Sequence, residues 1–260
     1  MTDDHTIQEM SCSDSKLINT PNLDNITKEG MQFNCCYVTS ATFAPSRAVI
    51  LTGKFSHQYG VTNNLDEFVG KQVTYPKLLR NAGYETAMIG KWHLGSTPTS
   101  FDYWSVLPGQ GDYYQPEFIE MGKTITEAGY VTDIITHKVI NWLENRDESK
   151  PFAMVYQQKA PHRNWIPAPR HLGIFEDKYF PEPENLFDKY EGRGAAASGQ
   201  KMEIKNYMWD AWNFKLASKE ELEQFAAKNS IEAIKNGKKH DMDGANSRTG
   251  NSIESSTFGI

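Results

Sequence analysis

Two short polar motifs carry side chains that could bind an anion. They are Lys91-Trp92-His93 and Pro161-His162-Arg163, and Arg47 supplies a further positive charge. Groups of this kind hold the oxygens of an anionic ester and stabilise the charge that develops on them. Each motif alone is better explained as a surface cation beside a hydrogen-bonded histidine. Considered together, they favour a site for an anionic ligand.

Two adjacent carboxylates, Asp3 and Asp4, stand near the start of the sequence. Carboxylate oxygens suit hard cations such as Ca²⁺ and Mg²⁺. Two acids in a polar segment are more often simply solvated, so both interpretations stay open at this point. The segment 241–246 faintly resembles a calcium loop, but it lacks the later glutamate of an EF-hand and is excluded.

Both cationic motifs follow segments with the pattern of a strand, Glu85–Ile89 and Phe152–Tyr156. Between them, residues 130–145 place Val131, Ile134, Ile135, Val139, Trp142 and Leu143 on one helical face. This alternation predicts an α/β fold with a mostly parallel central sheet flanked by helices. Ligands of such sheets gather beyond the carboxyl ends of the strands, where both motifs fall.

Other elements follow from local signals. Pro21 after Thr20 predicts a helix that ends at Gly30, and short helices are expected at 46–53 and 75–83. The alternation over Met31–Val38 predicts a strand.

The composition fits one substantial folded domain, alone or with an appendage. The chain has 260 residues, a net charge of −6 and an aromatic content of 12%, which favours a packed core. The acidic balance argues against a nucleic-acid or membrane-surface binder. No apolar run approaches the roughly 20 residues of a membrane span. The polar first residues contain no signal peptide, and three cysteines give neither a disulfide framework nor a zinc motif.

We predict three regions along the chain. Residues 1–190 form the main domain, and residues 191–237 form an irregular or helical extension. In that extension, a capping box at Ser218–Glu221 predicts a helix. Residues 238–260 are polar and are expected to be disordered.

Several motifs resemble those of the sulfatase family, within the alkaline-phosphatase superfamily. Ala44–Lys54 keeps the signature C-x-P-S-R-A-x-x-L-T-G followed by Lys or Arg, except for its first residue, and Gly83–Gly95 matches a second signature. Thr2–His5, Thr20–Asp24 and Lys159–His162 also fit in order. The resemblance covers residues 1 to about 190. It is nearest to bacterial sulfatases acting on sulfated sugars, such as N-acetylglucosamine-6-sulfatases.

The resemblance implies a specific chemistry. In this family a motif cysteine becomes formylglycine, whose hydrate attacks the sulfur of a sulfate ester, while Ca²⁺ and cationic side chains hold the sulfate. The implied ligand is therefore a sulfated sugar or another sulfate ester, and the family's members are typically periplasmic, secreted or lysosomal. The implied roles are metal ligation by Asp3 and Asp4, orientation of the nucleophile by Arg47, sulfate binding by Lys91, contact with the nucleophile by His93, and sulfate contact or leaving-group protonation by His162.

The sequence departs from the family at the nucleophile, which is replaced by Phe43. A phenyl ring cannot become formylglycine and has no nucleophilic atom, so we expect the hydrolase activity to be lost. The family's first strand and its later Asp-Asn-Gly metal motif also lack counterparts, which predicts a sheet truncated at both ends and an incomplete Ca²⁺ site. Three functions remain as alternatives: a sulfatase, a non-catalytic protein that binds sulfated sugars, and a non-functional gene fragment.

Overall fold

The computed structural model describes residues 1–200 in two compact units, Met1–His162 and the part that begins at Arg163. The helix expected after Ser218 and the tail 238–260 lie outside the described residues. The region boundaries at 190 and 237 stay predictions.

A five-stranded sheet forms the centre of the first unit, in the order β4-β3-β2-β1-β5. The strands are β1 (Glu85–Lys91), β2 (Tyr103–Leu107), β3 (Glu117–Glu120), β4 (Lys123–Thr126) and β5 (Phe152–Gln157). β1 pairs in parallel with both β2 and β5, whereas β3 pairs antiparallel with β2 and with β4. The expected α/β fold is confirmed, and the sheet is mixed, with a parallel half that carries both cationic motifs.

Strand β1, which lies between β2 and β5, is buried along almost its whole length. The neighbouring strand β5 approaches β1 closely at Gly90. The φ angle of Gly90 is 111°, and a Cβ added there would lie 1.7 Å from the carbonyl oxygen of Gln157. Only glycine combines that φ angle with that approach.

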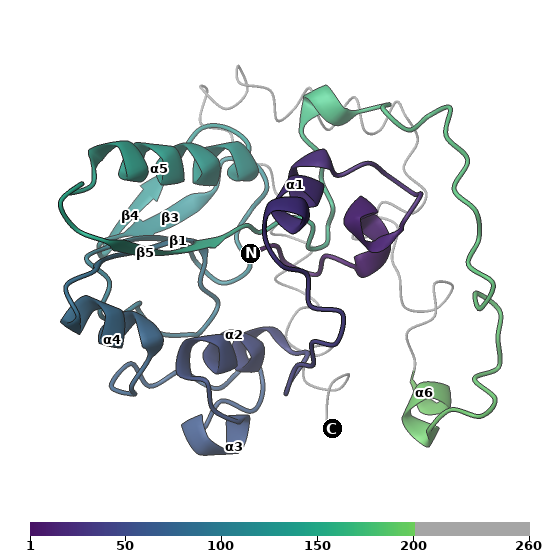
Figure 1. Cartoon of the computed structure of the whole chain (residues 1–260), viewed down its shortest axis with the longest axis horizontal. Coiled ribbons are helices and arrows are strands. Elements are labelled where there is room, and N and C mark those ends of the chain that lie inside the picture. The colour runs from purple at the N-terminus through teal and green to yellow at the C-terminus, as the bar shows by residue number, and fades with distance from the viewer. Residues whose placement is uncertain (201–260) are drawn as a thin grey trace. The chain divides into compact units, whose positions relative to one another are not determined.

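Helices cover both faces of this sheet (Figure 1). α5 (Val131–Asn145) lies on one face, and α2 (Phe43–Thr52), α3 (Ser56–Tyr59) and α4 (Tyr75–Asn81) lie on the other side. The predicted apolar face of α5 is buried except for Leu143, which is 36% exposed. The other face of the sheet packs on α2 through a core that includes Ala44, Ala48, Leu51, Met88, Val106 and Val155.

The N-terminal segment reaches the same sheet at the end of β5. The Met1 amino group donates to the Tyr156 carbonyl at 2.7 Å, and the Gln158 amide donates to the Met1 carbonyl at 2.9 Å. The Asp3 amide then donates to the Ala160 carbonyl at 3.2 Å. The two Met1 bonds alternate as in parallel pairing, and the Asp3 bond, which departs from that register, holds Asp3 beyond the carboxyl end of β5.

Two short 3-10 helices, η1 (Ile7–Glu9) and η2 (Ser11–Ser13), lead to α1 (Pro21–Glu29), which ends before Gly30 as predicted. The strand predicted over Met31–Val38 is wrong, because this segment is irregular. Its apolar side chains are 70–75% exposed at Met31, Phe33 and Val38. Alternation forms a strand only where a sheet edge pairs with it, and this segment pairs with no strand among residues 1–200.

The second unit, as far as residue 200, is mostly irregular and contains η3 (Pro169–His171) and α6 (Ala195–Gly199).

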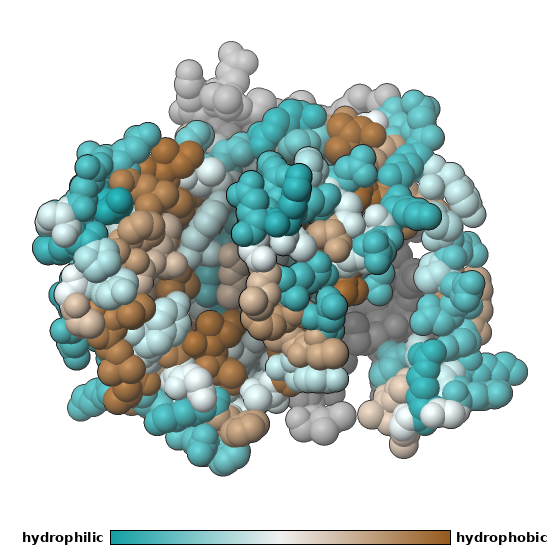
Figure 2. All heavy atoms as spheres, in the orientation of Figure 1, coloured by the Kyte–Doolittle hydropathy of each residue, from teal (hydrophilic) through white to brown (hydrophobic). Residues whose placement is uncertain are grey.

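Figure 2 shows a surface on which apolar residues are interspersed among hydrophilic ones. No helix within residues 1–200 combines the length and apolar character needed to cross a membrane.

Candidate functional site

The residues singled out from the sequence come together in the first unit, at the carboxyl ends of β1 and β5. Lys91 is the last residue of β1, and His93 follows it by two positions. Phe43 begins α2 and Arg47 lies one turn later, while His162 lies beyond β5. Asp3 arrives through the N-terminal segment.

A buried carboxylate, Asp3, links the two principal cations. It is 5% exposed, and its Oδ1 accepts a hydrogen bond from Nη2 of Arg47 at 3.0 Å, while its Oδ2 accepts one from Nζ of Lys91 at 2.5 Å. Burial would raise the pKa of Asp3, but the charges of Lys91 and Arg47 lower it below the ordinary value. Asp3 is therefore an ionised carboxylate that both cations share.

Arg47 makes further contacts that tie α2 to two strands. Its Nη1 donates to the carbonyl oxygen of Lys91 and to Oε1 of Gln157. Burial lowers the pKa of Arg47, which Asp3 opposes, and a guanidinium keeps its charge in such a setting. The Arg47 guanidinium thus connects α2 to β1, to β5 and to Asp3.

The phenyl ring of Phe43 lies in the middle of the cationic and titratable side chains. Nζ of Lys91 lies 4.7 Å from the ring centroid, over its face. The ring centroids of His93 and His162 lie 5.6 Å and 5.1 Å from that of Phe43. A hydrocarbon ring therefore occupies the centre of the site, at the position that the sequence motif assigns to the nucleophile.

The two histidines differ in their surroundings. Burial, followed by the charges of Lys91 and Arg47, lowers the pKa of His93 to about 4, so its imidazole is neutral near pH 7. Its Nδ1 is buried and has no hydrogen-bond partner within the described part of the chain. The Nε2 of His162 lies 3.7 Å from Oδ2 of Asp4.

The loop between β2 and β3 contributes residues that sequence analysis missed. Oε1 of Gln110 accepts from Nζ of Lys91 at 2.5 Å, and the Gln110 carbonyl accepts from Nζ of Lys159 at 3.2 Å. The Tyr113 hydroxyl donates to the His162 carbonyl, and the Tyr113 ring lies 4.7 Å from Nζ of Lys159. In the sequence, the two glycines beside Gln110 indicate a turn, but they do not indicate that Gln110 contacts Lys91 and Lys159.

Lys159 belongs to a recognised motif but received no role from the sequence. It is 4% exposed. Burial, followed by the charge of Lys91, lowers the pKa of Lys159 to about 8. The lowered pKa values of Lys159 and His93 both reflect burial first and the positive charge of Lys91 second.

A Ca²⁺ ion would need several oxygen ligands that are not already engaged. Both oxygens of Asp3 contact cationic side chains, and residues 1–200 contain no group of three or more His, Cys, Asp or Glu residues that could hold a metal. In this arrangement Arg47 and Lys91 contact both Asp3 oxygens, so neither oxygen is free of a cationic partner. Metal ligation by Asp3 and Asp4 stays a prediction.

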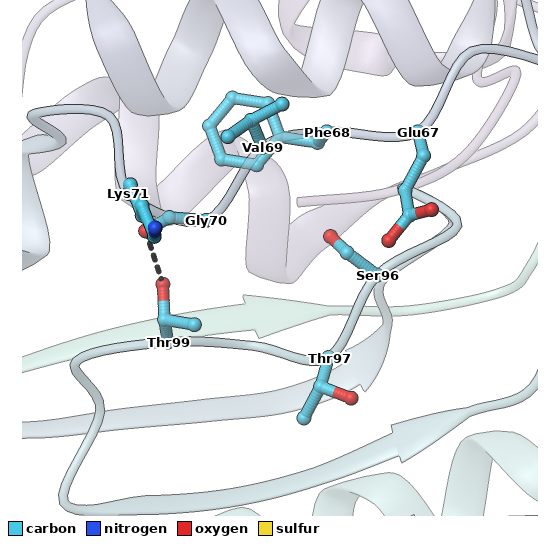
Figure 3. A pocket seen from close by; sticks show the side chains of 8 residues that line it. All are labelled: Glu67, Phe68, Val69, Gly70, Lys71, Ser96, Thr97 and Thr99. Carbon is cyan, nitrogen blue, oxygen red and sulfur yellow. Dashed lines mark hydrogen bonds between the residues drawn. The ribbon is translucent and has the colours of Figure 1, made fainter.

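A separate groove of about 600 Å³ lies between residues 67–71 and the 96–99 loop (Figure 3). Its two sides are joined by a hydrogen bond of 2.9 Å from the Thr99 hydroxyl to the Gly70 carbonyl. None of the site residues predicted from the sequence lines it.

Comparisons with known proteins agree on one family. An N-acetylglucosamine-6-O-sulfatase of Bacteroides thetaiotaomicron is 61% identical over 225 residues, which are 85% of this chain and 40% of that protein. An N-acetylglucosamine-6-sulfatase of Capra hircus is 31% identical over 186 residues, covering 62% of this chain and 33% of the relative. The chain therefore spans well under half the length of these relatives.

A solved structure gives the same result. It is described as a complex with its substrate D-glucosamine-2-N,6-O-disulfate, and it matches 100% of this chain and 54% of its own with 54% identity and a TM-score of 0.82. The sequence model of the Sulfatase family matches residues 1–227. The chain thus belongs to the sulfatase family.

Proposed function

We propose that this chain recognises sulfated sugars and does not hydrolyse sulfate esters by the formylglycine route. The observation that carries the proposal is the position of Phe43, whose ring lies among Lys91, His93 and His162. Family hydrolysis begins with a nucleophile at this position, and a phenyl ring offers no atom that could attack sulfur.

The electrostatics of the site support recognition of an anion. After burial, which is the largest cause, the charges of Lys91 and Arg47 disfavour a proton on His93, and the charge of Lys91 disfavours one on Lys159. A potential that repels a proton attracts a negatively charged group. A sulfate ester, with its charge spread over several oxygens, matches this environment.

The ligand class follows from the relatives. Two are named as sulfatases of N-acetylglucosamine-6-sulfate, and the solved neighbour is described with a sulfated glucosamine as substrate. We therefore assign glucosamine-6-sulfate or a similar sugar as the first ligand to test.

The test measures binding and turnover on the same purified protein. Calorimetric titration with glucosamine-6-sulfate should show saturable binding that weakens with salt, and unsulfated glucosamine should show none. Sulfate release from the same sugar should stay at the level of a protein-free control. Either a flat titration or reproducible turnover that co-purifies with the chain would refute the proposal.

Phe43→Cys provides the matched comparison. Co-expressed with an enzyme that generates formylglycine, this variant restores the family's nucleophile while the surrounding residues stay as they are. If the variant releases sulfate and wild type does not, the lack of activity in wild type is due to Phe43.

A further inference from the structure

We propose that the Phe43 ring also limits anion binding at this site, because it takes the place that a sulfate group would occupy. A sulfated ligand must displace the ring to reach the cationic side chains. The inference rests on the proposed function for the class of ligand. It goes further by predicting that a smaller side chain at position 43 improves anion binding.

The hydrogen-bond donors of Lys91 support this placement. An ammonium group has three N–H donors, and two acceptors of Lys91 are Oδ2 of Asp3 and Oε1 of Gln110. The ammonium also faces the Phe43 ring, 4.7 Å from its centroid. A ring face attracts a cation but accepts hydrogen bonds poorly, whereas a sulfate oxygen would accept a charge-assisted bond.

His93 gives a second, independent observation. Its buried Nδ1 lacks a hydrogen-bond partner among the described residues, and the Phe43 ring lies beside the imidazole. Buried polar atoms normally have a partner, and an exception calls for an explanation. The Phe43 ring provides this explanation, because it fills the adjacent space with hydrocarbon. A polar ligand that replaced the ring would give Nδ1 a partner.

Phe43 also lies where its ring can be truncated by mutation without loss of the fold. Phe43 is the first residue of α2, and the core of the sheet is formed by later residues of that helix, such as Ala48 and Leu51. Truncating the side chain therefore opens space within the site while the packing of α2 on the sheet is retained.

The experiment compares wild type, Phe43→Ala, Phe43→Ser and Phe43→Leu by calorimetry with inorganic sulfate and with glucosamine-6-sulfate. Circular dichroism and thermal melting first establish that each variant is folded. If either Phe43→Ala or Phe43→Ser fails to fold, the other small variant still tests the inference. We expect the small variants to bind sulfate at least tenfold more tightly than wild type. Phe43→Leu, which still fills the space, should stay within threefold of wild type.

Phe55→Ala is the matched control, because Phe55 is 58% exposed and lies outside the site. Its affinity for both ligands should equal that of wild type. Sulfate affinity that is equal in wild type and the small variants overturns the inference.

The possible outcomes separate this inference from the proposed function. If only the small variants bind, the ring blocks the site and recognition by the natural chain is refuted. If wild type binds the sulfated sugar and truncation brings no gain, recognition stands and the role of the ring is refuted. Absence of binding in all variants refutes both.

Discussion

Lys91 and Lys138 each lie over a phenylalanine ring and each have two oxygen partners, yet their environments differ in burial and charge. Lys91 is fully buried, lies 4.7 Å from the Phe43 centroid, and shares Asp3 with Arg47. Lys138 of α5 lies 5.0 Å from the Phe118 centroid and contacts Glu120 at 2.6 Å and Glu127 at 2.5 Å.

The pKa shifts of the two lysines point in opposite directions. Burial lowers the pKa of Lys91 more than Asp3 raises it. Burial would also lower the pKa of Lys138, but hydrogen bonds to Glu120 and Glu127 raise it above its ordinary value. Lys91 therefore shares the carboxylate of Asp3 with Arg47, whereas Lys138 contacts two carboxylates, those of Glu120 and Glu127. The difference teaches that burial and the supply of counter-charge, rather than residue type, separate the lysine of the anion-attracting site from the one that ties α5 to the sheet.

The strongest test removes the shared carboxylate. Asp3→Asn leaves Arg47 and Lys91 buried without their counter-charge, and breaking a buried ion pair in this way costs about 3–5 kcal/mol. We expect urea unfolding to show a loss of this size. Glu127→Gln, which leaves Lys138 paired with the nearby Glu120, should cost about 1 kcal/mol or less. Equal losses in the two variants would contradict the comparison.

The same substitution in the two lysines sharpens the comparison further. Lys91→Met leaves Asp3 paired with Arg47 alone, so we expect a loss of about 2 kcal/mol, below the cost of removing a sole partner. Lys138→Met acts on a partly exposed cluster and should cost about 1 kcal/mol. Urea unfolding of both variants measures the difference. A larger loss for Lys138→Met would reverse the ranking.

A smaller effect is expected from Tyr113, whose hydroxyl donates to the His162 carbonyl. Tyr113→Phe keeps the ring beneath Lys159 and removes this hydrogen bond, which is worth about 1 kcal/mol. Thermal unfolding should detect the loss, and Tyr37→Phe should have no effect because Tyr37 is 89% exposed. A loss in both variants would show that the assay does not report on the site.

The smallest effect concerns pH at Lys138. The pKa of Glu120 is lowered from 4.5 and that of Lys138 is raised from 10.5. Burial is the largest single influence and opposes the Glu120 shift, but the hydrogen bond and the charge of Lys138, with hydrogen bonds from Ser105 and Tyr103, together outweigh it. The stabilisation from Glu120 is thus fully present above pH 4.5 and is lost as pH falls through its lowered pKa, whereas that from Lys138 is present below pH 10.5 and is lost as pH rises through its raised pKa.

The difference in melting temperature between wild type and Lys138→Met should therefore be constant between these limits and shrink on both sides. A series of melting curves from pH 3 to pH 11 measures it. A difference that grows at either extreme would contradict the assignment.

The clustering of the predicted site residues could be expected from the sequence, because most of them lie at or beyond strand ends. Lys91 ends β1, His93 follows it, and His162 lies beyond β5, so the parallel pairing of β1 with β5 brings them to the same edge of the sheet. The contacts of Gln110 and Tyr113 could not be predicted, because these residues meet their partners only when the loop after β2 folds over the strand ends.

The errors have a related cause. The alternation over Met31–Val38 satisfies a strand pattern, but a strand needs a partner that no local pattern supplies. β3 and β4 have only four residues each and were missed, because such short segments carry little periodic signal.

The close approach at Gly90 has a consequence for the site. Because any side chain at this position would collide with the Gln157 carbonyl, Gly90 should be among the positions least tolerant of substitution in a mutational scan. The same approach fixes the register of β1 against β5, which pairs Gly90 with Gln157. An alanine at position 90 would therefore displace the two strand ends relative to each other, and with them the lysine and histidine that follow each strand. In this fold, the alignment of the cationic groups depends on a residue that carries no side chain.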